Sequence, residues 1–276
     1  MIRMSHNPAL SSMHKASGGE VVGDVATYKG TAVKTVYFAM TAFASAAAVM
    51  LLLFVLLAPV FEALALGYEP LAADFNRAIG VMGGIMIGGM VVGLVGMVGS
   101  IFARRLIPVF GTIYTVGQGA VMGAMSGFAE LLVPGIVFSA LLATFTVFAV
   151  MSVLFFTGVI KVGQRFRSAM MGIMLSILIF SLLFMIVMFV VPSMNAMFFN
   201  SIPFLLLSIG ISLVMIVVAS LMILFDLSII KEAVDNGLPK QFEWFGAFGL
   251  VVTLMWLYIE FVRLFLKLAI LLGRRR

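Results

Sequence analysis

Two carboxylates, Asp226 and Glu260, interrupt stretches of sequence that otherwise carry no charge. Asp226 follows 58 residues without a charged side chain (168–225), and Glu260 follows the uncharged segment 244–259. A charged carboxylate inside a bilayer is costly unless it is paired, hydrated or protonated, and such residues usually serve a function. Two facing carboxylates can share a proton and sense pH, or they can bind a hard cation such as Ca²⁺. Asp226 and Glu260 are therefore the candidate pH-sensing and cation-binding residues.

Polar residues around these carboxylates recur at helical spacing. In the later segment, positions three or four apart form one polar stripe: Thr253, Trp256, Glu260, Arg263 and Lys267. In the earlier segment, small residues form a face that ends in the first carboxylate: Ser208, Ser212, Ala219 and Asp226. If a hairpin joins the two helices, these faces pack together and place both carboxylates in the bundle interior. The simpler alternatives are an ion pair between Glu260 and Arg263, one turn apart, and a solvated helix-end charge for Asp226.

Arg104 and Arg105 stand together between two apolar segments. Adjacent arginines at such a place are typical anchors on the cytoplasmic side of a membrane. The sharper hypothesis is that one guanidinium reaches the acidic pair and acts as a latch. The polar face of the segment that follows, together with the stripe described above, supplies candidates for a pore lining: Thr115, Gln118, Ser126 and Thr253.

The composition places these side chains in a membrane protein. Of the 276 residues, 63% are hydrophobic and only 10% are charged, against roughly a quarter charged in a soluble domain. Too few polar side chains remain to cover a water-soluble globule, and disorder would need the opposite composition.

Several kinds of site are excluded by the residues that the sequence lacks. There is no Cys, and both histidines, His6 and His14, lie in the polar N-terminal segment, which excludes thiolate sites and a buried histidine metal site. The sequence shows no Ser/His/Asp arrangement, no phosphate-binding glycine loop and no pocket signature for a hydrolytic carboxylate pair. We therefore expect no enzymatic activity, no cofactor other than Ca²⁺ as a bound or permeant ion, and no nucleic-acid partner.

The gaps between charged residues predict seven membrane-spanning helices. A helix needs roughly 20 apolar residues to cross the hydrocarbon, so most gaps hold one helix. The longest gap is divided by turn-forming residues at 192–195 and 200–203. The predicted spans are 35–57, 79–102, 107–128, 135–157, 169–191, 204–226 and 246–271. The expected fold is an all-α, polytopic bundle, with 1–30 as a polar, loosely ordered arm and 31–276 as one transmembrane domain.

Lys and Arg predict the orientation. The N-terminal arm and alternate loops carry most of them, whereas the opposite loops hold only Arg77. Because cytoplasmic loops are enriched in Lys and Arg, we expect the N-terminus in the cytoplasm. With seven spans, the arginines at 274–276 would then lie outside. Either the last hairpin is partly re-entrant or, as we favour, the short tail is tolerated against the larger upstream bias.

The second predicted span is rich in glycines spaced by four, at 80, 84 and 88 and again at 89 and 93. This spacing lets two helix backbones approach closely in lipid. Close packing is the simpler expectation. The alternative is a helix that slides or tilts during gating.

The pattern around the two carboxylates resembles a known family. Asp226 at the end of one span, followed by the sequence at 257–265 in the next, is similar to the C-terminal signature of the Bax inhibitor-1 (YccA-like) membrane proteins. Arg104-Arg105 followed by Tyr114-Thr115 also looks like that family. The segments at 7–10, 134–137 and 244–249 resemble its bacterial branch.

This resemblance implies a seven-helix bundle in which the other six helices surround the last one. It also implies a pH-sensitive calcium leak, with the acidic pair as the sensor and an arginine in the closing interaction. Two positions depart from the family pattern. Glu260 stands where the family has aspartate, and Arg263, where the family has asparagine, is able to neutralise Glu260.

The first functional hypothesis is a cation-leak channel of the bacterial inner membrane, gated by protonation around Asp226 and Glu260. The second is a non-conducting regulator that binds a membrane protease or its substrates through the N-terminal arm, a role that the resemblance also implies. A weaker third hypothesis, a proton-coupled transporter, rests on the same carboxylates.

Overall fold

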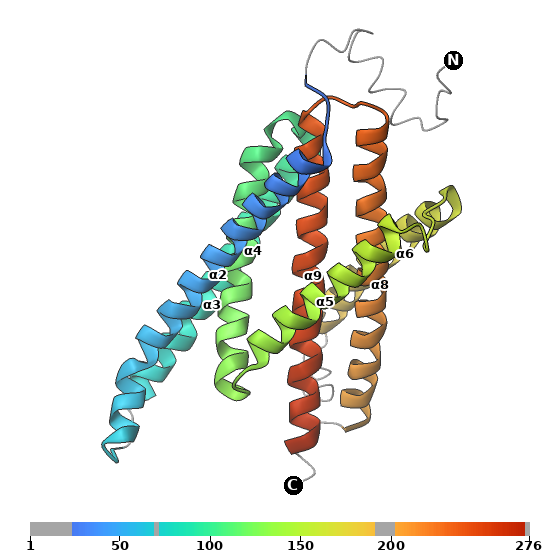
Figure 1. Ribbon diagram of the computed structural model, residues 1–276. Helices are drawn as coiled ribbons and strands as arrows, with labels where there is room; N and C mark the ends of the chain where they lie inside the picture. The colour runs from blue at the N-terminus through green and yellow to red at the C-terminus, as the bar shows by residue number, and fades with distance from the viewer. Residues whose placement is uncertain (1–23, 69–71, 191–201, 274–276) are drawn as a thin grey trace, which may run out of the picture.

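Seven long helices form almost the whole of the computed structural model, which describes residues 24–68, 72–190 and 202–273 (Figure 1). The long helices are α2 (Tyr28–Ala65), α3 (Ala72–Phe102), α4 (Ile107–Leu132), α5 (Ile136–Phe156), α6 (Gln164–Val190), α8 (Ile202–Asp235) and α9 (Gln241–Gly273). A short 3-10 turn, η1 (Arg104–Leu106), joins α3 to α4.

Each of the seven helices is long and apolar enough to cross a membrane, so the chain is a multi-pass membrane protein and the seven predicted spans are confirmed. Six of the seven helices extend past at least one predicted limit, whereas α5 is one residue shorter at each end. For example, α2 begins at Tyr28 rather than 35, and α8 continues to Asp235 rather than 226. The prediction followed only the uncharged core of each span, whereas the helices continue into the charged flanks. The predicted turn at 192–195 lies outside the described residues, as do the first two residues of the turn predicted at 200–203. Ile202 and Pro203 already belong to the first turn of α8.

The helix starts follow local sequence signals. The Thr27 hydroxyl accepts a hydrogen bond from the Gly30 amide (2.9 Å) and caps α2. Gly135 adopts a left-handed conformation (φ 85°) immediately before α5. The Glu130 carboxylate accepts hydrogen bonds from the amides of Gly135 (2.6 Å) and Val137 (3.1 Å), so it caps α5.

The last helix, α9, is central, as predicted. It packs against α2, α4, α5 and α8. In its most apolar stretch 61% of the residues are buried, against 6% in α6. The resemblance implied six surrounding helices, but the extensive contacts of α9 involve four. The remaining two lie farther out, since α3 packs on α2 and α4, and α6 packs on α8.

The glycine-rich helix α3 has two faces of different character. A Cβ added at Gly89, Gly93 or Gly96 would overlap atoms of α4, so these glycines allow the two backbones to approach closely. A Cβ added at Gly80, Gly84 or Gly88 would meet nothing within 4 Å. The predicted close packing is therefore confirmed for the second half of the helix only.

The expected boundary between arm and bundle falls at residue 30, but α2 already begins at Tyr28. Residues 24–27 precede it and contact the turn between α8 and α9. The loose order expected for the arm concerns mainly residues 1–23, which lie outside the described residues.

Candidate functional site

Asp226 lies on the side of α8 that faces α9, and only 6% of its surface is exposed. The Thr253 hydroxyl of α9 donates a hydrogen bond to its carboxylate (2.5 Å). A Cβ at Gly249, one turn earlier on α9, would come within 3.4 Å of the same carboxylate. A small residue at 249 therefore lets the carboxylate lie directly against the α9 backbone.

Asp226 also lines a cavity of about 420 Å³ between α3, α6, α8 and α9. The wall is largely apolar, and its polar side chains are Ser100, Arg104, Asp226 and Thr253, with the indole of Trp256 beside them. Ser100 is bonded to its own helix, at the Gly96 carbonyl (2.8 Å). Within the described residues, the Arg104 side chain forms no hydrogen bond or ion pair. The structure thus places the predicted latch residue and the predicted sensor on one cavity without bonding them.

The polar faces of α8 and α9 pack together as the spacing predicted. The Lys267 ammonium donates to the Ser212 hydroxyl (2.7 Å) and to the Ser208 carbonyl (3.0 Å). Where α8 packs on α9, Thr253 lies opposite Asp226 and Lys267 lies opposite Ser212. The two contacts are fourteen residues apart on each helix. One antiparallel register therefore holds along this interface between α8 and α9, which we call the seam.

This register separates the two carboxylates. Glu260 lies midway between Thr253 and Lys267, level with Ala219 of α8 rather than with Asp226. Seven residues of α-helix separate Glu260 from Thr253, which is about 10 Å along the axis. The structure brings Asp226 together with Thr253 but not with Glu260, and no hydrogen bond joins the two carboxyl groups among the described residues.

Glu260 is 4% exposed and has Arg263 as its ion-pair partner. The separation of 3.4 Å is long for a hydrogen bond, and the Arg263 side chain is 55% exposed. The predicted pairing one turn away is confirmed in this loose form. Glu260 is therefore compensated only in part.

The predicted pore-lining residues do not share one wall. Thr115 is bonded to Thr41 of α2 (2.8 Å), and Ser126 to Tyr258 of α9 (2.7 Å). Gln118 lies against Gly93 of α3. Of the four candidates, Thr253 alone lines the cavity that contains Asp226. Arg104 and Arg105 are both exposed, and of these two only Arg104 lines the cavity wall.

In the described part of the chain, Asp226 and Glu260 do not come together as one calcium site. Ca²⁺ prefers six to eight oxygen ligands, whereas Asp226 and Glu260 lie at different levels of the seam. Among the described residues, no group of three or more His, Asp or Glu side chains is placed to hold a metal ion.

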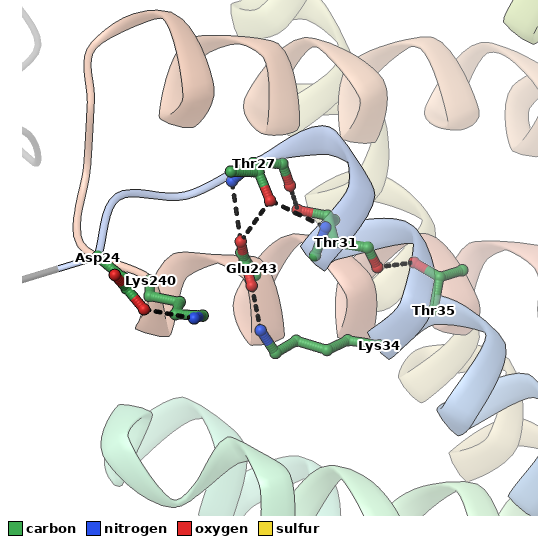
Figure 2. Close-up of polar contacts among 8 residues, drawn as sticks. Asp24, Thr27, Thr31, Lys34, Thr35, Lys240 and Glu243 are labelled. Atoms are coloured by element: carbon green, nitrogen blue, oxygen red, sulfur yellow. Dashed lines mark hydrogen bonds and ion pairs between the residues drawn. The ribbon is translucent and has the colours of Figure 1, made fainter.

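The sequence reasoning missed a third buried carboxylate, Glu243, in the first turn of α9 (Figure 2). It is 1% exposed and accepts hydrogen bonds from the Thr27 amide and hydroxyl, both at 2.9 Å. Lys34 of α2 forms an ion pair with its second oxygen and lies 5.2 Å from the Trp244 ring centre. Both charges flank predicted spans on the same predicted side of the membrane, and this was the available signal that they could pair.

Residues 24–27, which we call the strap, tie this carboxylate to the α8–α9 turn. Val25 forms a β-bridge with Pro239, and the Ala26 amide donates to the Leu238 carbonyl (2.8 Å). At the exposed edge the Lys240 ammonium donates to the Asp24 carboxylate (2.6 Å). This contact lowers the pKa of Asp24 and raises that of Lys240.

Comparison with known proteins identifies the family of the chain. A family model described as Bax inhibitor 1 like matches residues 7–270, which include six of the seven long helices in full and α9 to within three residues of its end. Searches of curated proteins and of solved structures found no match. The chain therefore belongs to the Bax inhibitor 1 like family.

Proposed function

We propose that this protein is a cation leak of the bacterial inner membrane, permeable to Ca²⁺, gated by protonation of Asp226, with its N-terminus in the cytoplasm. The observation that carries the proposal is the position of Asp226. It is a buried carboxylate on a cavity wall with a hydroxyl as its only bonded partner among the described residues.

The electrostatics of that position give Asp226 two stable conditions. An ionised carboxylate in a membrane interior is costly without a counter-charge, so it favours either a proton or a nearby cation. Thr253 supplies one neutral hydrogen bond and no charge. Protonation and cation binding therefore compete for the same carboxylate.

Besides a proton and a cation, the Arg104 guanidinium is a third group that can compete for the Asp226 carboxylate. It lies on the same cavity wall and has no partner among the described residues. An ionised Asp226 attracts the guanidinium and closes the cavity, whereas a protonated Asp226 releases it. Lowering the pH would then open the leak.

Glu260 is the second position along the same seam where a cation would meet a carboxylate. It lies about 10 Å further along α9 than Thr253, and Arg263 compensates its charge only loosely. A cation released from Asp226 would next meet this carboxylate. Two separated acidic stations suit conduction better than tight binding, because an ion must also leave.

The test measures Ca²⁺ entry into proteoliposomes at several pH values on both sides of neutrality, from about 5.5 to about 8. Asp226→Asn is expected to abolish the pH dependence, and Arg104→Gln to raise flux at the high-pH end by about tenfold, because a charge-assisted pair is lost. Arg105→Gln is the matched control, since Arg105 lies outside the cavity wall. Equal flux and equal pH dependence in all four proteins would reject the leak and favour the non-conducting regulator.

A further inference from the structure

We propose that the cavity between α3, α6, α8 and α9 is a binding site for a single long-chain fatty acid, whose carboxylate pairs with Arg104 while its chain fills the apolar interior. The proposal goes beyond the cation leak and does not depend on conduction.

The cavity has the size and lining of a small-molecule site. Its volume of about 420 Å³ falls within the range of natural ligand pockets, which are mostly apolar with a few placed polar groups. Most of the wall consists of aliphatic, sulfur-containing and aromatic side chains, among them Met97, Ile101, Met222, Phe225, Phe245 and Trp256. Away from Asp226 and Thr253 this wall offers a hydrated cation no polar partner, whereas an alkyl chain fits it.

Arg104 gives the site its polarity. Its guanidinium stands where α3 ends and is unpaired within the described residues. Ile107, one turn further along the chain, packs with Ala247 and Phe248 near the start of α9. Arg104 therefore marks one end of the cavity, from which the lining continues along α9 to Trp256.

A carboxylate is the head group that suits this end. The planar guanidinium donates two parallel hydrogen bonds to a carboxylate, and such charge-assisted pairs are among the strongest in proteins. One cationic side chain and one cavity of this volume fit one head group and one chain. The chain would pass Asp226 on the α8 wall, where the Thr253 hydroxyl already bonds that carboxyl.

The packing of the outer helices offers a route from the bilayer. Among the described residues, α3 packs on α2, α4 and η1, and α6 on α8, while no substantial contact joins α3 to α6. Both helices nevertheless contribute to the cavity wall, through Met97 and Met174. A lipid chain can therefore reach the cavity between them without crossing the helix-packed side of the bundle.

The two tryptophans make the test possible in the whole protein. Trp256 lines the cavity, whereas Trp244 packs on Tyr37, Phe38 and Lys34 at the strap. In a Trp244→Phe background, titration with dibromostearate in detergent micelles should quench the fluorescence of Trp256 with a saturable curve. The complementary Trp256→Phe protein should show no saturable quenching.

Two variants assign the head group. Arg104→Gln should raise the half-saturation concentration at least about tenfold. Arg104→Lys keeps the charge without the planar guanidinium, so its half-saturation concentration should fall between those of the parent and Arg104→Gln. Arg105→Gln should match the parent. Retention of the parent elution profile and melting temperature shows that each variant is folded.

Three outcomes would overturn the proposal. The first is quenching that only rises in proportion to the bromolipid content of the micelle. The second is a half-saturation concentration unchanged by both Arg104 variants. The third is equal or tighter binding of the brominated methyl ester or of a brominated alkylammonium, which would assign the cavity to a neutral lipid or to a cation at Asp226.

Discussion

Two buried carboxylates on the α8–α9 hairpin, Glu243 and Asp226, differ in how their charge is balanced. Glu243 accepts two hydrogen bonds from Thr27 and an ion pair from Lys34. Asp226, which is also buried, accepts one hydrogen bond from a neutral hydroxyl. Burial is therefore common to both carboxylates, and the charge of their partners distinguishes them.

Their surroundings reinforce the contrast. Glu243 lies in the first turn of α9, where the helix dipole favours a negative charge. Asp226 lies nine residues before the end of α8, inside the bundle and beside a cavity. Next to the strap, at what we call the strap end of the molecule, the charges are held in fixed pairs. In the cavity, Arg104 and Asp226 lie on one wall and are not bonded to each other.

The largest expected effect comes from breaking the balanced carboxylate. Glu243→Ala leaves the Lys34 ammonium largely buried without its partner and the Thr27 donors unsatisfied. We expect a loss of about 3 kcal/mol in the free energy of unfolding, measured by denaturant titration in detergent micelles. Asp226→Asn keeps the shape of the side chain and removes only an unbalanced charge, so its stability should equal or exceed that of the parent.

A double variant sharpens this comparison. Lys34→Met combined with Glu243→Gln removes both charges of the pair, so it should cost less than the sum of the two single changes. If the costs simply add, or if Asp226→Asn destabilises as much as Glu243→Ala, the distinction between a balanced and an unbalanced carboxylate fails.

A smaller effect is expected where the strap end is tightly packed. A Cβ at Gly30 would overlap the Glu243 carboxylate. Gly30→Ala should therefore push this carboxylate from its partners and cost about 1–3 kcal/mol in the free energy of unfolding. Gly80→Ala is the matched control, because a Cβ there meets nothing within 4 Å and alanine is the better helix former. Similar losses for the two variants would show that α3 is also covered at Gly80.

Much of the fold was predictable from the sequence, because the membrane penalty keeps charge out of the spans. The uncharged gaps gave all seven helices. The spacing of Thr253, Glu260 and Lys267 likewise identified the face of α9 that packs on α8. These predictions need only the local periodicity of one helix and the cost of charge in lipid.

The register of the seam and the partners of Glu243 were not predictable in this way. Facing polar stripes do not say which residue lies opposite which, so Asp226 and Glu260 were expected to meet when they are two turns apart. The pair of Lys34 and Glu243 joins residues 209 positions apart. Each of these residues flanks a span, where a single charged residue is typical of a solvated membrane anchor.

The smallest effect is expected at the exposed edge of the strap, where Asp24 and Lys240 form a pair open to solvent. Lys240 lowers the pKa of Asp24 below its ordinary value of 3.8. A lowered carboxylate pKa contributes stability that is complete above the ordinary value and is lost as the pH falls through the lowered one. At neutral pH this contribution is complete, but it is small because exposed pairs are screened by solvent. Lys240→Gln should leave the melting temperature almost unchanged.

The same variant should still be visible in the titration of Asp24. Its pKa, followed by NMR of the labelled carboxyl carbon, should rise back towards the ordinary value when Lys240→Gln removes the ammonium. The Lys231→Gln change, which breaks a separate exposed pair with Asp235 on α8, should leave the pKa of Asp24 where it was. A large stability loss from Lys240→Gln would mean that the strap depends on its outer pair rather than on Glu243. In that case the balanced carboxylate would no longer be the tie that holds residues 24–27 against α9.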